Sequence, residues 1–102
     1  MHYSRLCAVL IDCNVSDVDA AAKFWAEALG RPLDLDHPGS RGNYRMLQTP
    51  ADEPIVQIQR VDHESRVHLD IETDDIPAEV ARLEKLGAKV VNRLEGWVVI
   101  VS

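Results

Sequence analysis

The chain has 102 residues, which is enough for one domain with a single hydrophobic core. Hydrophobic residues make up 46% of the sequence and charged residues 27%, which excludes an intrinsically disordered chain. The sequence contains no run of about 18 apolar residues, so it predicts no membrane-spanning helix. The formal net charge of −6, without a cluster of Lys and Arg, argues against a nucleic-acid partner.

The first half of the sequence predicts a strand, a helix and three further strands. Residues 5–13 have the mixed apolar character of a strand. Asp17 supplies an N-cap, apolar side chains recur at helical spacing from Val18 to Leu29, and Gly30 is suited to end the helix. Loops that contain Gly and Pro then separate three predicted strands, at residues 33–36, 44–48 and 55–61.

The second half repeats this plan and ends one strand earlier. Residues 66–72 are predicted to form a strand, Asp75 precedes the next helix, Pro77 lies in its first turn and Gly87 ends it. Two more strands are predicted, at residues 89–91 and 97–101.

The two halves are related by an internal repeat. At one constant offset Asp12 matches Asp70, and the two N-cap aspartates and the apolar positions between them match as well. Each match falls at the same point of a strand-turn-helix pattern, which favours duplication over chance. We therefore expect a single domain over residues 1–102, with one module over about residues 1–61 and a second over about residues 66–102.

These segments resemble the glyoxalase-like branch of the vicinal-oxygen-chelate superfamily, which also includes bleomycin-resistance proteins and dioxygenases. The motifs that carry the resemblance are Phe24-Trp25 and Ala28-Leu29-Gly30 in the first module, and Arg66-Val-His68-Leu-Asp70 and Leu86-Gly87-Ala88 in the second. The resemblance implies an α+β fold. Two βαβββ modules, the second without its last strand, would form a curved mixed sheet around a cavity, with the helices on its outer face.

The resemblance also implies where a divalent ion would bind in metal-using members of the superfamily. One ligand position falls on His68, its counterpart in the first module falls on Leu10, and a third falls near Gln57, with Gln59 as the other candidate. The fourth would lie on the absent last strand. Because a catalytic zinc site typically has three protein ligands, we expect no cofactor. Weak binding of a divalent metal at His68 and Gln57 is the alternative.

The strand at residues 66–72 provides independent evidence for a site. Alternation places Arg66, His68 and Asp70 on one face and Val67 and Leu69 on the other. The polar face suits a cavity for a small molecule with an apolar body and a polar group. His68 and Asp70 are the catalytic candidates, as a general base and the carboxylate that orients it, and a solvated strand face is the alternative.

Further side chains are candidates for ligand binding, and several have a structural alternative. Asp12 matches Asp70 in the repeat and could pair with it, or serve a capping or surface role. Trp25 fits the core as well as a ligand platform, and Trp97 opens an apolar strand that could line a cavity. The predicted ligand-binding residues are Asp12, Trp25, Gln57, Gln59, Arg66 and Trp97.

Location and assembly follow from the cysteines and the last predicted strand. Cys7 and Cys13 on one strand would lie roughly 20 Å apart, too far for a disulfide, so we expect reduced thiols in a cytoplasmic protein. Residues 97–101 are apolar on both faces, and an exposed apolar edge invites pairing. We therefore expect a homodimer, with strand exchange as one route to it.

Three functions are consistent with these residues. The first is a small-molecule-binding domain that lacks the full metal site of the family. The second is a lyase or isomerase in which His68 acts as a general base beside a carbonyl group. The third is a degenerate domain that acts only through oligomerisation. The identity of the ligand depends on loop conformations that the sequence does not predict.

Overall fold

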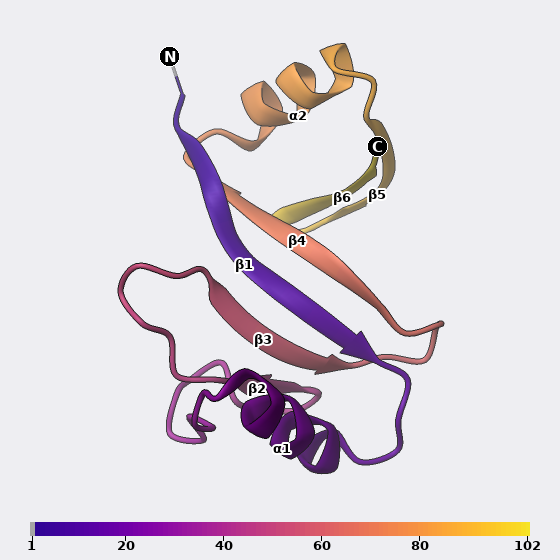
Figure 1. Cartoon of the computed structure of the whole chain (residues 1–102). Coiled ribbons are helices and arrows are strands. Elements are labelled where there is room, and N and C mark those ends of the chain that lie inside the picture. Colours follow the sequence, from indigo (N-terminus) through magenta and orange to yellow (C-terminus); the bar gives the residue numbers. More distant parts are fainter. Residues whose placement is uncertain (1) are drawn as a thin grey trace. The chain divides into compact units, whose positions relative to one another are not determined.

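The computed structural model describes residues 2–102 and has the predicted α+β element order (Figure 1). A strand, a helix and two strands are followed by a second strand, helix and two strands. The elements are β1 (Ser4–Cys13), α1 (Val18–Leu29), β2 (Tyr44–Met46), β3 (Ile55–Arg60), β4 (Arg66–Thr73), α2 (Ile76–Lys85), β5 (Lys89–Leu94) and β6 (Trp97–Val101).

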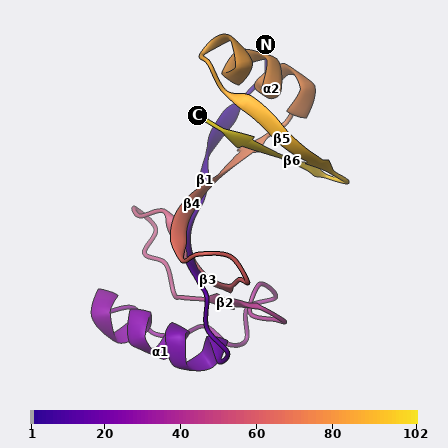
Figure 2. The ribbon, with the colours of Figure 1, turned by 90° about the vertical axis from the view of Figure 1, so that its right-hand side faces the viewer.

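Four strands form a mixed sheet in the order β2-β3-β1-β4. β1 is parallel to β3, and β2 is antiparallel to β3. β4 lies beside β1 and runs in the opposite direction, as Figures 1 and 2 show. The opening strands of the two repeats are therefore neighbours in one sheet, which puts the matched segments side by side.

α1 covers one face of this sheet and forms its core. Val18, Ala22 and Trp25 follow one another at helical spacing and face the strands, where Cys13 and Ile58 meet them. Ala22 and Ile58 are completely buried. Figure 2 shows the helix on a single side of the strands. The opposite face of the sheet is left without a helix of this segment.

Both helices begin and end as the sequence predicts. The Asp17 carboxylate accepts hydrogen bonds from the amides of Asp19 and Ala20, and the Asp75 carboxylate accepts one from Ala78. Gly30 follows α1 with a φ of 67°, a left-handed conformation that glycine adopts without strain. The N-caps of the two repeats are thus the same in the structure as in the sequence.

One predicted strand is reduced to a single bridge. The segment at residues 33–36 pairs with the chain only through Leu33 and Leu47. The amide of Gln48 donates to the carbonyl of Pro32, and the amide of Asp34 donates to the carbonyl of Met46. A turn begins directly afterwards, because the amide of His37 donates back to Asp34. Pairing ends there, so the prediction of a full strand was wrong.

The chain divides into two compact units, which are described separately. The first is continuous and covers Leu6–Asp70, and the second joins Ile71–Ser102 to the N-terminal residues up to Arg5. The boundary does not follow the repeat, because most of β4 belongs to the same unit as β1. Within the first unit Val67 and Leu69 are 58% and 62% exposed, so no helix of that unit covers them.

In the second unit α2 packs on a two-stranded sheet of β5 and β6. Glu79, which is 4% exposed, accepts two hydrogen bonds from Arg82, at 2.7 and 2.8 Å, and lies 3.0 Å from the imidazole of His2. The hydrogen bonds from Arg82, with a smaller contribution from His2, lower the pKa of Glu79 to about 2.

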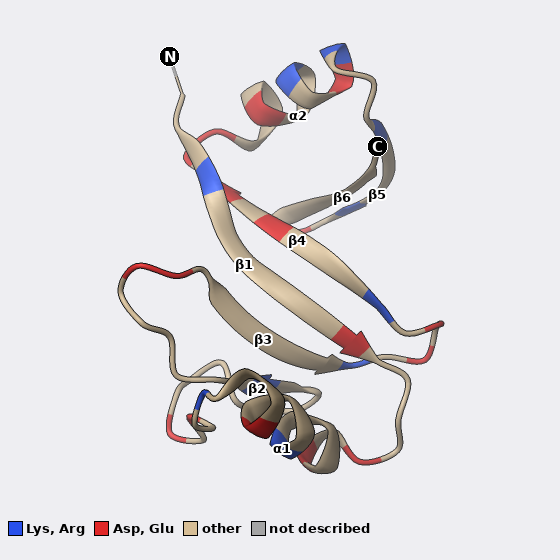
Figure 3. Cartoon of the chain, viewed as in Figure 1, with Lys and Arg blue, Asp and Glu red and all other residues tan. Residues whose placement is uncertain are grey.

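Charged residues are spread over both units and do not gather on one helix or strand. Figure 3 shows Lys and Arg in separate places along both units, with Asp and Glu among them. Within residues 2–102, neither helix is long and apolar enough to cross a membrane.

Candidate functional site

The register of the sheet brings most predicted site residues onto one face. Gln59 is opposite Asp12 and Gln57 is opposite Leu10, across β3 and β1. Tyr44 on β2 is opposite Gln59. Residues opposite one another on neighbouring strands point to the same face. This face, called the polar face below, is the one that α1 does not cover.

Asp12 connects β1 to β4 on the polar face. Its Oδ2 atom lies 2.8 Å from Nδ1 of His68, 3.8 Å from Nε of Arg66 and 3.9 Å from Nε2 of His63. Asp12 is 2% exposed, and its other oxygen, Oδ1, has no hydrogen-bond partner among the described residues. A carboxylate is thus buried next to three nitrogen-bearing side chains with half of its acceptor capacity unused.

His68 lies between two carboxylates. Asp12 accepts from Nδ1, and Oδ1 of Asp70 lies 3.4 Å from Nε2. An ionised Asp12 requires the proton on Nδ1, so in the neutral imidazole Nε2 is an acceptor. The His68 side chain is 37% exposed, and an external molecule can reach it. The structure thus places His68 and Asp70 together, as expected, and adds Asp12 as the closer partner.

Trp25 lies on the helix side of the sheet, away from the polar face. It packs against the core and, with Phe24, lines an open groove of about 580 Å³ that extends to Asp12 and Arg66 at the end of the strands. The two rings meet edge to face, with centroids 5.1 Å apart. Cys13 also lines this groove, and burial raises the pKa of its thiol.

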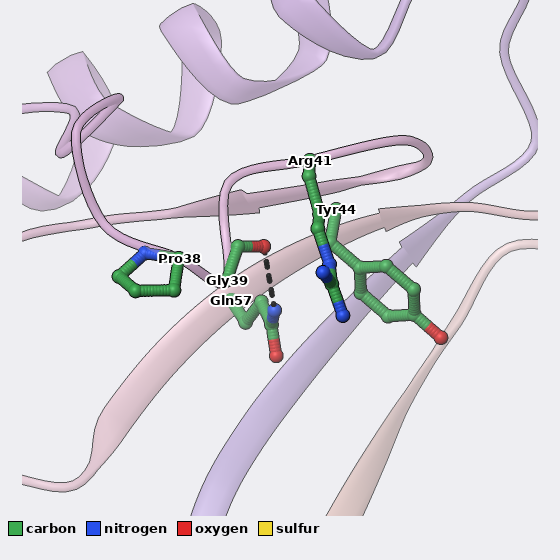
Figure 4. A pocket seen from close by; sticks show the side chains of 5 residues that line it. All are labelled: Pro38, Gly39, Arg41, Tyr44 and Gln57. Carbon is green, nitrogen blue, oxygen red and sulfur yellow. Dashed lines mark hydrogen bonds between the residues drawn. The ribbon is translucent and has the colours of Figure 1, made fainter.

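A second hollow of about 380 Å³ lies where a loop meets β2 and β3 (Figure 4). Its lining residues come from residues 38–41 of the loop and from the polar sides of both strands. The side-chain amide of Gln57 donates to the carbonyl of Gly39 at 3.3 Å. The residues that line this loop pocket are Pro38, Gly39, Arg41, Tyr44 and Gln57.

Several site residues differ from the predicted set. Trp97 lies on β6 in the other unit, whereas Gln59 and Arg66 lie next to Asp12. His63 and Arg41 were not predicted, because both lie in loops and have no regular spacing from other site residues. The one signal in the sequence near Arg41 is the Gly-Ser-Arg-Gly composition of its loop. This composition predicts a turn and does not predict that the loop lines a pocket.

The sequence was also compared with models of known protein families. The family model described as a glyoxalase-like domain matches residues 8–101. The chain belongs to the glyoxalase-like domain family. No curated protein matches the chain.

The resemblance implies positions for metal ligands, and the structure shows which side chains this glyoxalase-like domain has there. Leu10, on β1, has no donor atom and is 2% exposed, and it separates Gln57 on β3 from β4. The amide nitrogen of Gln57 is already bonded to the loop. Among residues 2–102, no group of three or more His, Cys, Asp or Glu side chains is placed to hold a metal ion. These donors do not fit the metal site implied by the resemblance.

Proposed function

We propose that this glyoxalase-like domain binds a small molecule on its polar face and does so without a tightly bound metal. The observation that carries the proposal is Oδ1 of Asp12, a buried acceptor that has no partner among residues 2–102 and lies beside the exposed edge of His68. Leaving a buried acceptor without a partner costs about 1–3 kcal/mol. Such exceptions are rare in folded proteins and each calls for a partner, which we propose the ligand supplies.

The neighbouring side chains define the kind of molecule. Gln59 and Arg66 add polar contacts, and the ring of Tyr44, which is 36% exposed, provides an apolar surface beside Gln59. A ligand with an N–H or O–H group for Asp12 and an apolar body for the rest would meet all of these groups.

Binding is tested by a thermal-shift screen of small aromatic, carbonyl, amine and hydroxyl compounds, with amide chemical shifts to locate each hit. Hits with a donor group are expected to shift β1 and β4 resonances and to bind Asp12→Asn about tenfold more weakly. Gln59→Ala is a milder variant that keeps the buried carboxylate, and Gln48→Ala, beyond the end of β2, is its control. Hits that bind all three variants as they bind the parent would exclude this site.

A lyase or isomerase activity is the second candidate, and the 2.8 Å contact between Asp12 and His68 favours it. A carboxylate on Nδ1 fixes the imidazole and leaves Nε2, which lies 3.4 Å from Oδ1 of Asp70, as the basic nitrogen of a general base. The test is incorporation of solvent deuterium next to the carbonyl group of a bound compound. His68→Gln should abolish this exchange and His2→Gln, in the other unit, should leave it, and an equal loss in both variants would contradict the assignment.

The absence of a tight metal is tested by titration of the protein with Zn²⁺, Mg²⁺ and Mn²⁺. A ligand that binds only the folded state raises the melting temperature with the logarithm of its excess over Kd. We expect the metals to leave the melting temperature of the parent unchanged. The His68→Gln variant should respond in the same way as the parent.

We also propose a homodimer in the cytoplasm, the location predicted from the sequence. Among residues 2–102, neither outer edge of the β5–β6 sheet pairs with another strand. On β6 the side chains of Trp97, Val99 and Val101 are 59%, 41% and 48% exposed. An exposed apolar face with open edges favours association. Light scattering at micromolar concentration gives the assembly state, and a monomer would contradict the proposal.

A further inference from the structure

Arg41 differs from the other arginines of the Leu6–Asp70 unit in having no carboxylate partner. Four arginines of this unit form ion pairs: Arg31 with Glu53, Arg45 with Asp19, Arg60 with Asp62 and Arg66 with Asp12. The guanidinium of Arg41 makes no ion pair or hydrogen bond with the described residues. In a chain of net charge −6, this leaves the exposed guanidinium of Arg41 available to an external anion.

The loop pocket presents hydrogen-bond donors and no acid. Its side-chain groups are the Arg41 guanidinium, the Tyr44 hydroxyl and the Gln57 amide, and no Asp or Glu lines it. Figure 4 shows Arg41 and Tyr44 extending over the strands beside Gln57. Guanidinium groups bind carboxylates through paired, charge-assisted hydrogen bonds. We propose that this pocket binds the carboxylate of an organic acid, with Arg41 as the main contact.

The loop that carries Arg41 is held in place by hydrogen bonds of its own residues. The Ser40 hydroxyl donates to the carbonyl of Asp34 at 2.6 Å and accepts from the amide of Met46 at 2.8 Å. At the far end of the loop, the amide of Arg60 donates to the carbonyl of Asn43 at 2.7 Å. A preformed loop loses little entropy on binding, so its donors are available to a ligand at low cost.

The distance to Asp12 defines the rest of the ligand. Tyr44, Gln59 and Asp12 form one row across β2, β3 and β1. Two strand spacings separate the ends of the row by about 10 Å. This step rests on the proposed function, because Asp12 is its binding group. The ligand class is therefore an elongated organic acid, with a carboxylate at Arg41 and a hydroxyl or amine donor at Asp12.

The experiment uses the full, isotope-labelled chain and para-hydroxyphenylacetate, with its uncharged amide as the matched probe. The acid should shift the amides of Gly39 and Tyr44 and the side-chain amide of Gln57, and should bind at least several-fold more tightly than the amide. Arg41→Gln should weaken binding of the acid about tenfold and abolish its advantage over the amide. Arg93→Gln removes an unpaired arginine from the other unit and should change nothing.

Three results would overturn the carboxylate site. Equal binding of the acid and its amide would remove the role of charge, and Arg41→Gln with unchanged affinity would remove the role of Arg41. In both cases shifts at Asp12 and His68 would leave the proposed function standing. Absence of shifts on the whole polar face at millimolar concentrations of both probes would contradict both proposals.

Discussion

Asp12 and Asp70 hold equivalent positions in the repeat, but their carboxylates lie in different surroundings. Asp12 is on β1, which has neighbours on both sides, and it is 2% exposed. Asp70 is on β4, an edge strand of the same sheet, and its side chain is 53% exposed. The sequence predicted that both face one way, because alternation depends only on position. It did not predict which one is buried, because burial depends on the order of the strands.

Gly39 is a residue at which one added methyl group should matter. A Cβ atom there would lie 2.9 Å from Cγ of Met46 and 3.1 Å from Nδ1 of His37. Overpacking of this kind costs about 1 kcal/mol or more, so Gly39→Ala should destabilise the loop and weaken binding of the organic acid.

The control for this prediction is a double-mutant cycle measured by chemical denaturation. In the Met46→Ala background the closest contact is gone, so Gly39→Ala should cost clearly less than in the parent. An equal cost in both backgrounds would show that Met46 is not the obstacle.

Glu79 should titrate far below an ordinary glutamate. Hydrogen bonds from Arg82 and His2 lower its pKa from 4.5 to about 2 in the folded state. The folded pKa is the lower one, so the stabilisation is complete above pH 4.5 and is lost as the pH falls toward 2. The difference in unfolding free energy between the parent and Glu79→Gln should therefore shrink as the pH falls across this interval.

The Glu79 pKa itself is measured from the side-chain carbon resonance during an acid titration. Arg82→Gln should move the midpoint upward, because it removes the larger cause. A midpoint near 4.5 in the parent would contradict the structure.

At the scale of elements, the helices were predicted well because their signals are local. A cap aspartate, a helical apolar spacing and a glycine stop fall within each helix and its immediate flanks. The segment at residues 33–36 was predicted less well. Its pairing depends on a partner strand and on a turn that begins at Asp34, neither of which is visible in four residues.

The two N-caps give a prediction at this scale. Asp17→Ala and Asp75→Ala each remove the acceptor of free helix amides and should lower the free energy of unfolding by about 1 kcal/mol. Chemical denaturation measures the change. Asp52→Ala, in an exposed loop and without a hydrogen bond or ion pair to the described residues, should have little effect, and comparable losses at all three positions would argue for a general charge effect instead.

At the scale of the whole molecule, the exposed face of β6 is the contact that we propose for the dimer. Val99 lies between Trp97 and Val101 on this face. Val99→Lys places a charge in the proposed dimer contact, where it cannot be solvated, so the dimer should dissociate. Sedimentation measures the shift toward monomer, and Glu95→Lys in the adjoining turn is a charge control that should stay dimeric. A Val99→Lys variant that remains dimeric would place the interface elsewhere.

The loop pocket that contains Arg41 could not be predicted from the sequence. Gln57 and His68 were reached through the family resemblance, whereas Arg41 became visible only when the loop was seen against β2 and β3. Which loop residue meets which strand depends on side-chain packing around Gly39 and Met46, and no spacing rule in the sequence describes that packing.

The antiparallel contact between β1 and β4 has a consequence for how such a site can arise. Asp12 comes from the first repeat and His68 from the second, so one repeat by itself holds only half of the pair. Two separate half-length chains could bring these groups together only by meeting in solution, at a rate and extent set by their concentration. Joining the halves through one peptide linker makes that encounter intramolecular and independent of dilution.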